Sequence, residues 1–122
     1  MPADRDLVFI VDTDQAVRDS LRFVIELDGM SVRTCGSCTE LLAHPELALA
    51  CCAIVDGAAF ERDGSSVLEQ LEAGASMPIV LVADHISRRA LPRTIAGGRL
   101  IVVEKPVMDD ALLRCVREIR AV

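Results

Sequence analysis

The 122-residue chain contains no tryptophan, no tyrosine and only three phenylalanines, so aromatic residues make up 2% of it. Hydrophobic residues nevertheless make up 52%, and any core must therefore be built from aliphatic side chains. A chain of this length can bury such a core without disulfides or metals. We expect a single domain over residues 1–122, with its core at about residues 6–120.

Three further absences limit the function. Basic residues are not in excess, and the net charge of −6 argues against a nucleic-acid partner. No apolar stretch could span a bilayer and the N-terminus lacks the apolar segment of a signal peptide, so we expect a soluble cytoplasmic protein with no membrane partner. No glycine-rich phosphate loop follows the first apolar run, which disfavours a nucleotide-binding enzyme, and we expect no enzymatic activity.

What the chain does contain is a regular alternation of short, branched apolar runs with helical patterns. Strands are expected near residues 7–11, 30–34, 51–55, 79–82 and 100–103. Helices are expected over residues 14–28, from 38, over 66–74, over 87–98 and from 109. This alternation predicts an α/β fold with three layers: a doubly wound, five-stranded parallel sheet in the flavodoxin/CheY-like order 2-1-3-4-5.

Local signals place the ends of several helices. The helix over residues 14–28 has a periodic apolar face and Gly29 as a stop signal. That face comprises Val17, Leu21, Val24, Ile25 and Leu27. Residues 37–40 have the capping-box pattern, a polar loop is expected over residues 56–64, and Asp109 is expected to cap the last helix.

Three polar residues, Asp12, Asp56 and Lys105, each follow a predicted strand. The carboxyl ends of parallel strands form one edge of an open sheet, so these side chains should share one pocket. Asp56 suits a nucleophile for a phosphoryl group, and Asp12, helped by Asp14, suits a Mg²⁺ ion shared with Asp56. Lys105 suits an anchor for phosphoryl oxygens.

The segments over residues 11–21, 53–56 and 103–106 together resemble the response-regulator receiver domain, particularly its FixJ-like branch. The resemblance covers the whole chain. It implies that Asp56 is the phosphoacceptor, that Lys105 contacts the phosphate and precedes a cis bond to Pro106, and that the partner is a sensor histidine kinase.

The sequence also departs from the receiver pattern. Thr13 replaces the second acid that usually binds Mg²⁺ directly, which leaves only weak Mg²⁺ binding at Asp12 and Asp56. Ala83 stands where the family keeps Ser or Thr, and Val102 where it has an aromatic switch residue. The resemblance therefore implies a receiver whose phosphate switch is weakened.

Our leading hypothesis is an atypical stand-alone receiver of the FixT-like kind, which binds and inhibits a sensor histidine kinase and has no output domain. Docking is expected on the first helix, at Val17, Arg18, Leu21 and Arg22, with both arginines exposed. The alternative is an ordinary receiver phosphorylated on Asp56.

Five cysteines, Cys35, Cys38, Cys51, Cys52 and Cys115, are many for a reducing compartment. The first four suggest an iron–sulfur cluster or zinc, and with it a redox-sensing regulator, although each alone suits a small core residue. The fold would place the first pair at the end of one strand and the second pair at the start of another, about 17 Å away for a five-residue strand. A shared cluster would then need a rearrangement or two chains.

Overall fold

The computed structural model describes residues 6–60, 62, 78–83, 100–104 and 109–120. The helices expected over residues 66–74 and 87–98 lie outside these described residues, as does the bond between Lys105 and Pro106.

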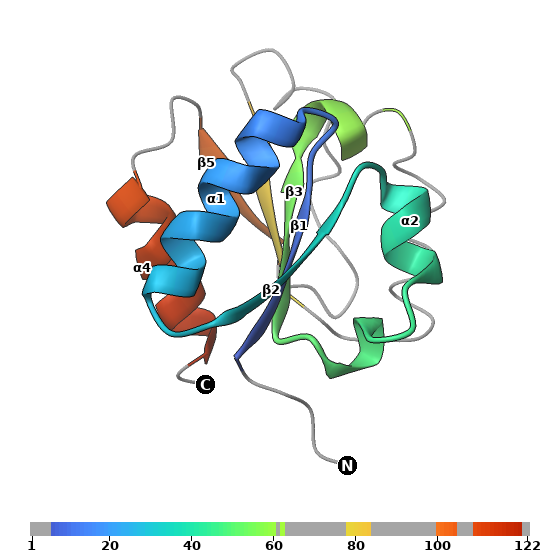
Figure 1. The fold of residues 1–122 in the computed structure, drawn as a ribbon. Coiled ribbons are helices and arrows are strands. Elements are labelled where there is room, and N and C mark those ends of the chain that lie inside the picture. The colour runs from blue at the N-terminus through green and yellow to red at the C-terminus, as the bar shows by residue number, and fades with distance from the viewer. Residues whose placement is uncertain (1–5, 61, 63–77, 84–99, 105–108, 121–122) are drawn as a thin grey trace.

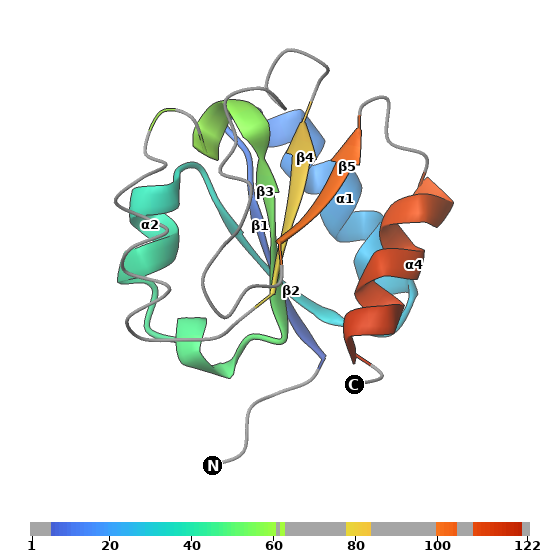
Figure 2. The same ribbon diagram turned by 180° about the vertical axis from the view of Figure 1, so that it is seen from behind.

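The described strands form one parallel sheet in the order β2-β1-β3-β4-β5, which confirms the predicted fold (Figures 1 and 2). The strands are β1 (Leu7–Val11), β2 (Ser31–Cys35), β3 (Cys52–Asp56), β4 (Ile79–Ala83) and β5 (Leu100–Glu104). β3 begins and ends one residue later than predicted, so Asp56 is its last residue rather than the first residue of a loop.

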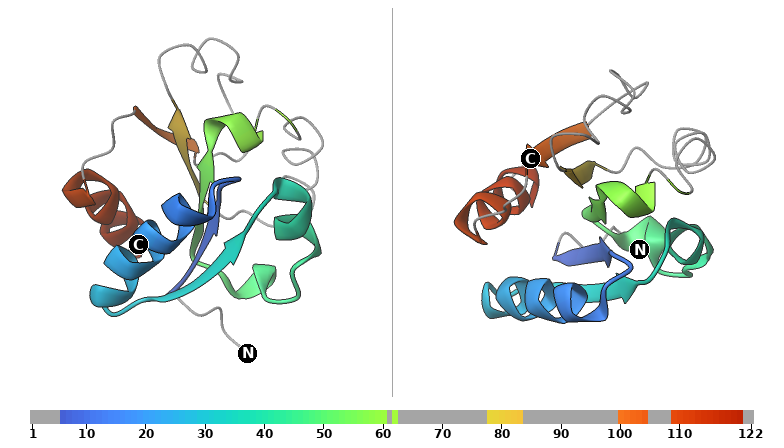
Figure 3. Two further views of the ribbon diagram at one scale, coloured as in Figure 1. Left: turned by 45° about the horizontal axis from the view of Figure 1, so that its top comes forward. Right: turned by 90° about the horizontal axis from the view of Figure 1, so that it is seen from above.

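Helices cover both faces of the sheet. The right-hand view of Figure 3 shows α1 (Gln15–Leu27) and α4 (Asp109–Arg120) on one face and α2 (Cys38–Ala43) on the other. A 3-10 helix, η1 (Leu47–Leu49), follows α2. Asp109 is the first residue of α4, so the prediction that it precedes the helix as a cap was wrong by one position.

The core consists of two layers, one on each face of the sheet, because successive residues of a strand point to opposite sides. In β1, Leu7, Phe9 and Val11 belong to the layer beneath α2, which we call the α2 face. Val8 and Ile10 belong to the layer beneath α1 and α4, which we call the α1/α4 face. All five residues of β1 are at most 2% exposed, as expected for a strand covered on both faces.

The helix ends follow the capping signals of the sequence. The Asp14 carboxylate accepts hydrogen bonds at the start of α1, and the Ser37 hydroxyl accepts one from the backbone N–H of Glu40 at the start of α2, with an N–O distance of 3.2 Å. The Glu40 carboxylate reaches back to the N–H of Gly36 at 3.0 Å. Gly29, after the C-cap Asp28, has a φ of +90°, a conformation that favours glycine.

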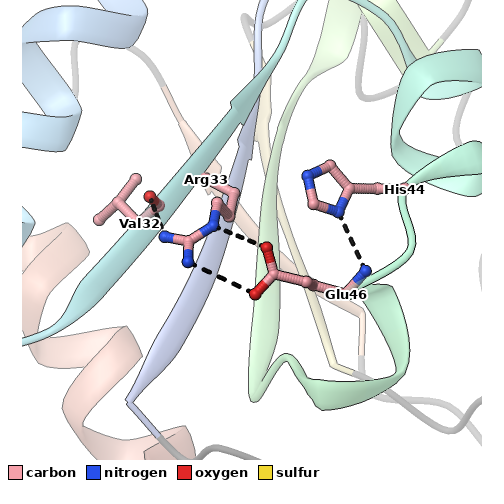
Figure 4. A network of polar contacts seen from close by, with 4 residues as sticks. All are labelled: Val32, Arg33, His44 and Glu46. Carbon is pink, nitrogen blue, oxygen red and sulfur yellow. Dashed lines mark hydrogen bonds and ion pairs between the residues drawn. The ribbon is translucent and has the colours of Figure 1, made fainter.

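Two ion pairs join distant parts of the chain. The Arg33 guanidinium of β2 donates to both carboxylate oxygens of Glu46, at 3.0 and 3.4 Å, and to the carbonyl of Val32 (Figure 4). The N–H of Glu46 donates to His44 Nδ1 at 3.1 Å, which fixes the connection after α2. On the other face, Arg117 of α4 donates through both Nε and Nη2 to the Asp28 carboxylate at the end of α1.

Candidate functional site

Three carboxylates lie at the carboxyl edge of the sheet, the upper edge in Figure 1. Asp12 follows β1, Asp14 precedes α1 and Asp56 ends β3. All three line one cleft with a volume of about 860 Å³. The rest of the described lining is mostly apolar. Apart from Val11, which belongs to the α2 face, it comes from α1 and the α1/α4 face: Ile10, Ala16, Val17, Ser20, Leu21, Ile54, Val82 and Leu112.

The carboxylates of Asp12 and Asp14 support the turn that leads into α1. The N–H of Asp14 donates to Asp12 Oδ1 at 2.9 Å. Asp14 Oδ1 accepts from the N–H groups of Ala16 at 2.9 Å and Val17 at 3.4 Å. Asp14 is therefore the N-cap of α1, a structural role that draws this oxygen towards the helix N-terminus.

Asp56 is buried, with 6% of its surface exposed, and is the buried charged residue of the described core. Residues 57–60 directly after it are helical, so the predicted polar loop was wrong at this point. The N–H of Ala58 donates to Asp56 Oδ2 at 3.2 Å, while Ala59 and Phe60 are buried on the α2 face. Asp56 thus lines the cleft from the end of β3.

Asp12 and Asp56 line the same cleft, and one or two carboxylates are what proteins often use to hold Mg²⁺, an ion that keeps several of its waters. Within the part of the chain that the structure describes, no three His, Cys, Asp or Glu side chains converge as a metal-binding group. Asp14 Oδ1 is engaged at the start of α1, and the assistance of Asp14 in binding the ion stays a prediction. Asp12 and Asp56 are the residues that would hold a Mg²⁺ ion, with few protein ligands.

Arg18 has a role that the sequence analysis missed. Its Nη1 donates to the backbone carbonyl of Asp12 at 2.6 Å, and the side chain is half-buried, not exposed as predicted. It also lies near the end of β2, where it lowers the pKa of Cys35 against larger opposing effects. Arg18 braces the loop between β1 and α1, and its guanidinium is engaged within the molecule.

The other predicted docking residues on α1 differ in exposure. Val17 is 38% exposed, whereas Leu21 is half-buried and lines the cleft. Arg22 is exposed and forms an ion pair with Glu26 at 3.2 Å. Leu27, which the sequence analysis placed on the inward face, is 71% exposed, because it lies off the side of α1 that carries the buried Ile25.

The remaining predicted site residues are described in part. Thr13 is exposed between the two carboxylates of the loop after β1. Ala83 ends β4 and pairs in register with Glu104, while Val102 pairs with Leu81 in the middle of β5. Lys105 lies outside the described residues, so its role as phosphate anchor stays a prediction.

The structure does not bring the four predicted metal-binding thiols together. Cys35 and Cys38 belong to the core of the α2 face, where the Cys38 thiol donates to the carbonyl of Ala59 at 3.8 Å. Cys52 belongs to the α1/α4 face, and Cys51 packs against that layer. Because the sheet separates the two pairs, a cluster shared by all four within one chain does not fit this fold.

The surroundings of the thiols favour their protonated form. Burial, aided by Glu40, raises the pKa of Cys35 to about 11. The neighbouring Cys51 thiol, with an Sγ–Sγ distance of 4.0 Å, and burial raise the pKa of Cys52. Burial also raises the pKa of Cys115. Since the thiolate is the metal ligand and the nucleophile, these three positions suit core packing.

Comparisons with known proteins agree with this architecture. The family model for the response regulator receiver domain matches residues 8–117. The C4-dicarboxylate transport transcriptional regulatory protein DctR of Rhodobacter capsulatus is 30% identical over 109 residues, which cover 87% of this chain and 55% of that protein. The transcriptional regulatory protein FixJ of Azorhizobium caulinodans is 29% identical over 111 residues, or 90% of this chain and 53% of that protein. The chain thus spans about half the length of these relatives.

Solved structures give the same result. Full-length FixJ from B. japonicum matches 96% of this chain and 58% of its own with a TM-score of 0.76 and 25% identity. A response regulator receiver protein from Burkholderia phymatum matches 100% of this chain and 97% of its own with a TM-score of 0.72 and 26% identity. In the described residues, every helix is too short or too polar to cross a membrane. The chain therefore belongs to the response regulator receiver domains of two-component signalling.

Proposed function

We propose that this receiver binds a sensor histidine kinase and inhibits it by occupying the kinase's receiver-docking surface. The observation that supports this best is the engagement of the acidic loop. The Oδ1 atoms of both Asp12 and Asp14 accept backbone N–H groups of the loop and of α1. These hydrogen bonds fix the conformation of the loop. They also occupy carboxylate oxygens that could otherwise bind a cation.

Docking would centre on the N-terminal end of α1, which lies beside the acidic edge of the sheet, because a kinase histidine must approach Asp56 there. Val17 is the partly exposed apolar residue at this end. Arg18 and Asp14 hold the loop and the helix in place, which lowers the ordering cost that a partner must meet. A rigid receiver surface with a weak phosphate switch can retain the kinase without passing a signal on.

The test is a kinase assay with increasing amounts of the chain. We expect autophosphorylation of the partner kinase, or transfer to its usual receiver, to fall as the chain is added. Asp56→Ala should inhibit as well as the unmodified chain, because docking and not phosphate uptake causes the effect. Val17→Asp should weaken inhibition at least tenfold, whereas Thr39→Ala on the exposed surface of α2 should not. Unchanged kinase activity at excess protein would refute the proposal.

A second candidate is phosphorylation of Asp56, which is supported by its position at the end of β3 in the lining of the cleft. The carboxylate oxygen would attack the phosphorus of the donor, whose bond to its leaving group breaks as an acyl phosphate forms. Mg²⁺, held by Asp12 and Asp56, would supply charge neutralisation when bound. Labelling of the chain by a small phosphodonor, and loss of that label in Asp56→Ala, would support this function. If Asp56→Ala also lost kinase inhibition, the inhibition would result from transfer of phosphate to Asp56 and not from docking alone.

A further inference from the structure

The outward side of α1 carries two large apolar residues that the fold leaves uncovered. Phe23 is 65% exposed and Leu27 is 71% exposed. The other two phenylalanines of the chain, Phe9 and Phe60, are 0% and 4% exposed. Two large apolar side chains exposed together on one side of a helix favour a contact surface.

The two residues belong to a narrow stripe along the helix. At 100° per residue, Ala16, Ser20, Phe23 and Leu27 lie on one side of α1, and all four are exposed. We call these four residues the α1 stripe. Their spacing of four, three and four residues is that of the seam of a coiled coil. Ala16 and Ser20 also line one side of the cleft, so the stripe begins at the cleft.

The stripe is complementary to itself. Its spacing reads the same in both directions, and its small residues lie at one end and its large residues at the other. In an antiparallel pair of helices, Ala16 would face Leu27 of the partner subunit, and Ser20 would face Phe23 of the partner subunit. Each large side chain would then meet a small one, and the two helix dipoles would run in opposite directions, which is favourable.

We propose that the α1 stripe binds the α1 stripe of a second copy of this chain, antiparallel and about a two-fold axis. Such an interface is isologous, with each pair of contacts occurring twice. One helix face is smaller than a standard interface of roughly 1,600 Å², so the pairing is weak and depends on concentration. It needs no kinase, and it would compete with docking on α1.

The experiment is sedimentation equilibrium of the full chain over a wide concentration range, with a reducing agent present. We expect a reversible monomer–dimer equilibrium. Phe23→Ala should weaken it at least tenfold, because a large side chain is lost from two symmetric contacts. The matched control is Arg22→Ala on the charged side of the same helix, away from the stripe, which should leave the equilibrium unchanged. Circular dichroism verifies that each variant is folded.

A size exchange within the stripe tests the register. Leu27→Ala alone should weaken the dimer, and the double variant Ala16→Leu with Leu27→Ala should restore it, because position 16 faces position 27 across the axis. A dimer that persists in Phe23→Ala, or a double variant that is not restored, would overturn the proposal. The proposal would also be overturned if the unmodified chain were monomeric at every concentration. In that case, weaker kinase binding by Phe23→Ala would identify the stripe as a kinase-binding surface instead.

Discussion

The two faces of the sheet carry similar aliphatic side chains, but within the described residues the acidic cleft opens on the α1/α4 face. On the α2 face, Leu41 and Phe9 are fully buried. The rings of Phe9 and His44 pack edge to face, with a distance of 4.8 Å between the ring centroids. On the α1/α4 face, α1 and α4 leave the cleft of about 860 Å³ between themselves and the strands. The acidic edge and the predicted docking residues adjoin this second face. The comparison suggests that one face stabilises the fold, while the other is shaped for contacts.

The largest expected effect is a difference in the free energy of unfolding between two leucine-to-alanine variants, one on a helix of each face. Leu41→Ala on α2 should lower the free energy of unfolding by about 3 to 4 kcal/mol, because removing a fully buried side chain leaves a cavity. Leu21→Ala on α1 should cost only about 1 kcal/mol, since that side chain is half-buried beside existing space. Urea unfolding measures both. Equal losses would show that the two faces do not differ in packing.

The same comparison of the two faces can be made by enlarging a side chain instead of shortening it. Val55→Leu, on the α2 face of β3, should cost about 1 to 3 kcal/mol because this side chain is buried among other core residues and is not part of the cleft lining. Val82→Leu, on the adjacent strand but beside the cleft, should cost less than about 1 kcal/mol. Thermal unfolding of the two variants checks this pair. If Val82→Leu were the more damaging change, the cleft would not accept added volume.

The two helix caps give a smaller effect. Asp14→Ala and Ser37→Ala should each lower stability by about 1 kcal/mol, because an N-cap oxygen that accepts backbone N–H groups is lost. Asp14→Asn retains an acceptor and is the matched control. Hydrogen exchange at the first turn of α1 should increase in Asp14→Ala. Unchanged exchange there would argue against the capping role of Asp14 and against its part in holding the loop.

The smallest effect at neutral pH concerns Cys35. Its folded-state pKa, raised by burial and Glu40 to about 11, lies above the ordinary value of 9.0. The unfolded chain therefore loses this proton first, and stability falls as the pH rises from 9 towards 11. Cys35→Ala should reduce that fall without changing the slope below pH 8. Equal slopes for both proteins, measured by urea unfolding at each pH, would contradict the raised pKa.

The sequence was sufficient for the sheet because its signals are local. The apolar runs, the Ser37 cap and the stop at Gly29 each depend on a few neighbouring residues, and the position of Asp56 at a strand end followed from the same pattern. The cleft, the reach of Arg18 to the Asp12 carbonyl and the exposure of Leu27 were not predictable in this way. They depend on the distance between α1 and the sheet and on the rotation of α1 about its axis. Both are determined by packing between segments that are distant in the sequence.

The helical turn after Asp56 shows a second limit. Residues 57–60 were interpreted as loop because glycine and a change of composition follow the strand, yet Ala59 and Phe60 gain burial on the α2 face by becoming helical. Burial of an aromatic side chain outweighed the local preference of a glycine.

The ion pair between Asp28 and Arg117 joins residues that are 89 positions apart. During synthesis, β1, β2 and β3 with α1 and α2 can leave the ribosome well before α4 exists. Leu112 and Val116, which help to close the α1/α4 face, must therefore arrive last. Until then the part of this side of the sheet that α4 later covers would be exposed in the nascent chain. A chaperone, or another nascent copy, could reach its apolar surface during that interval.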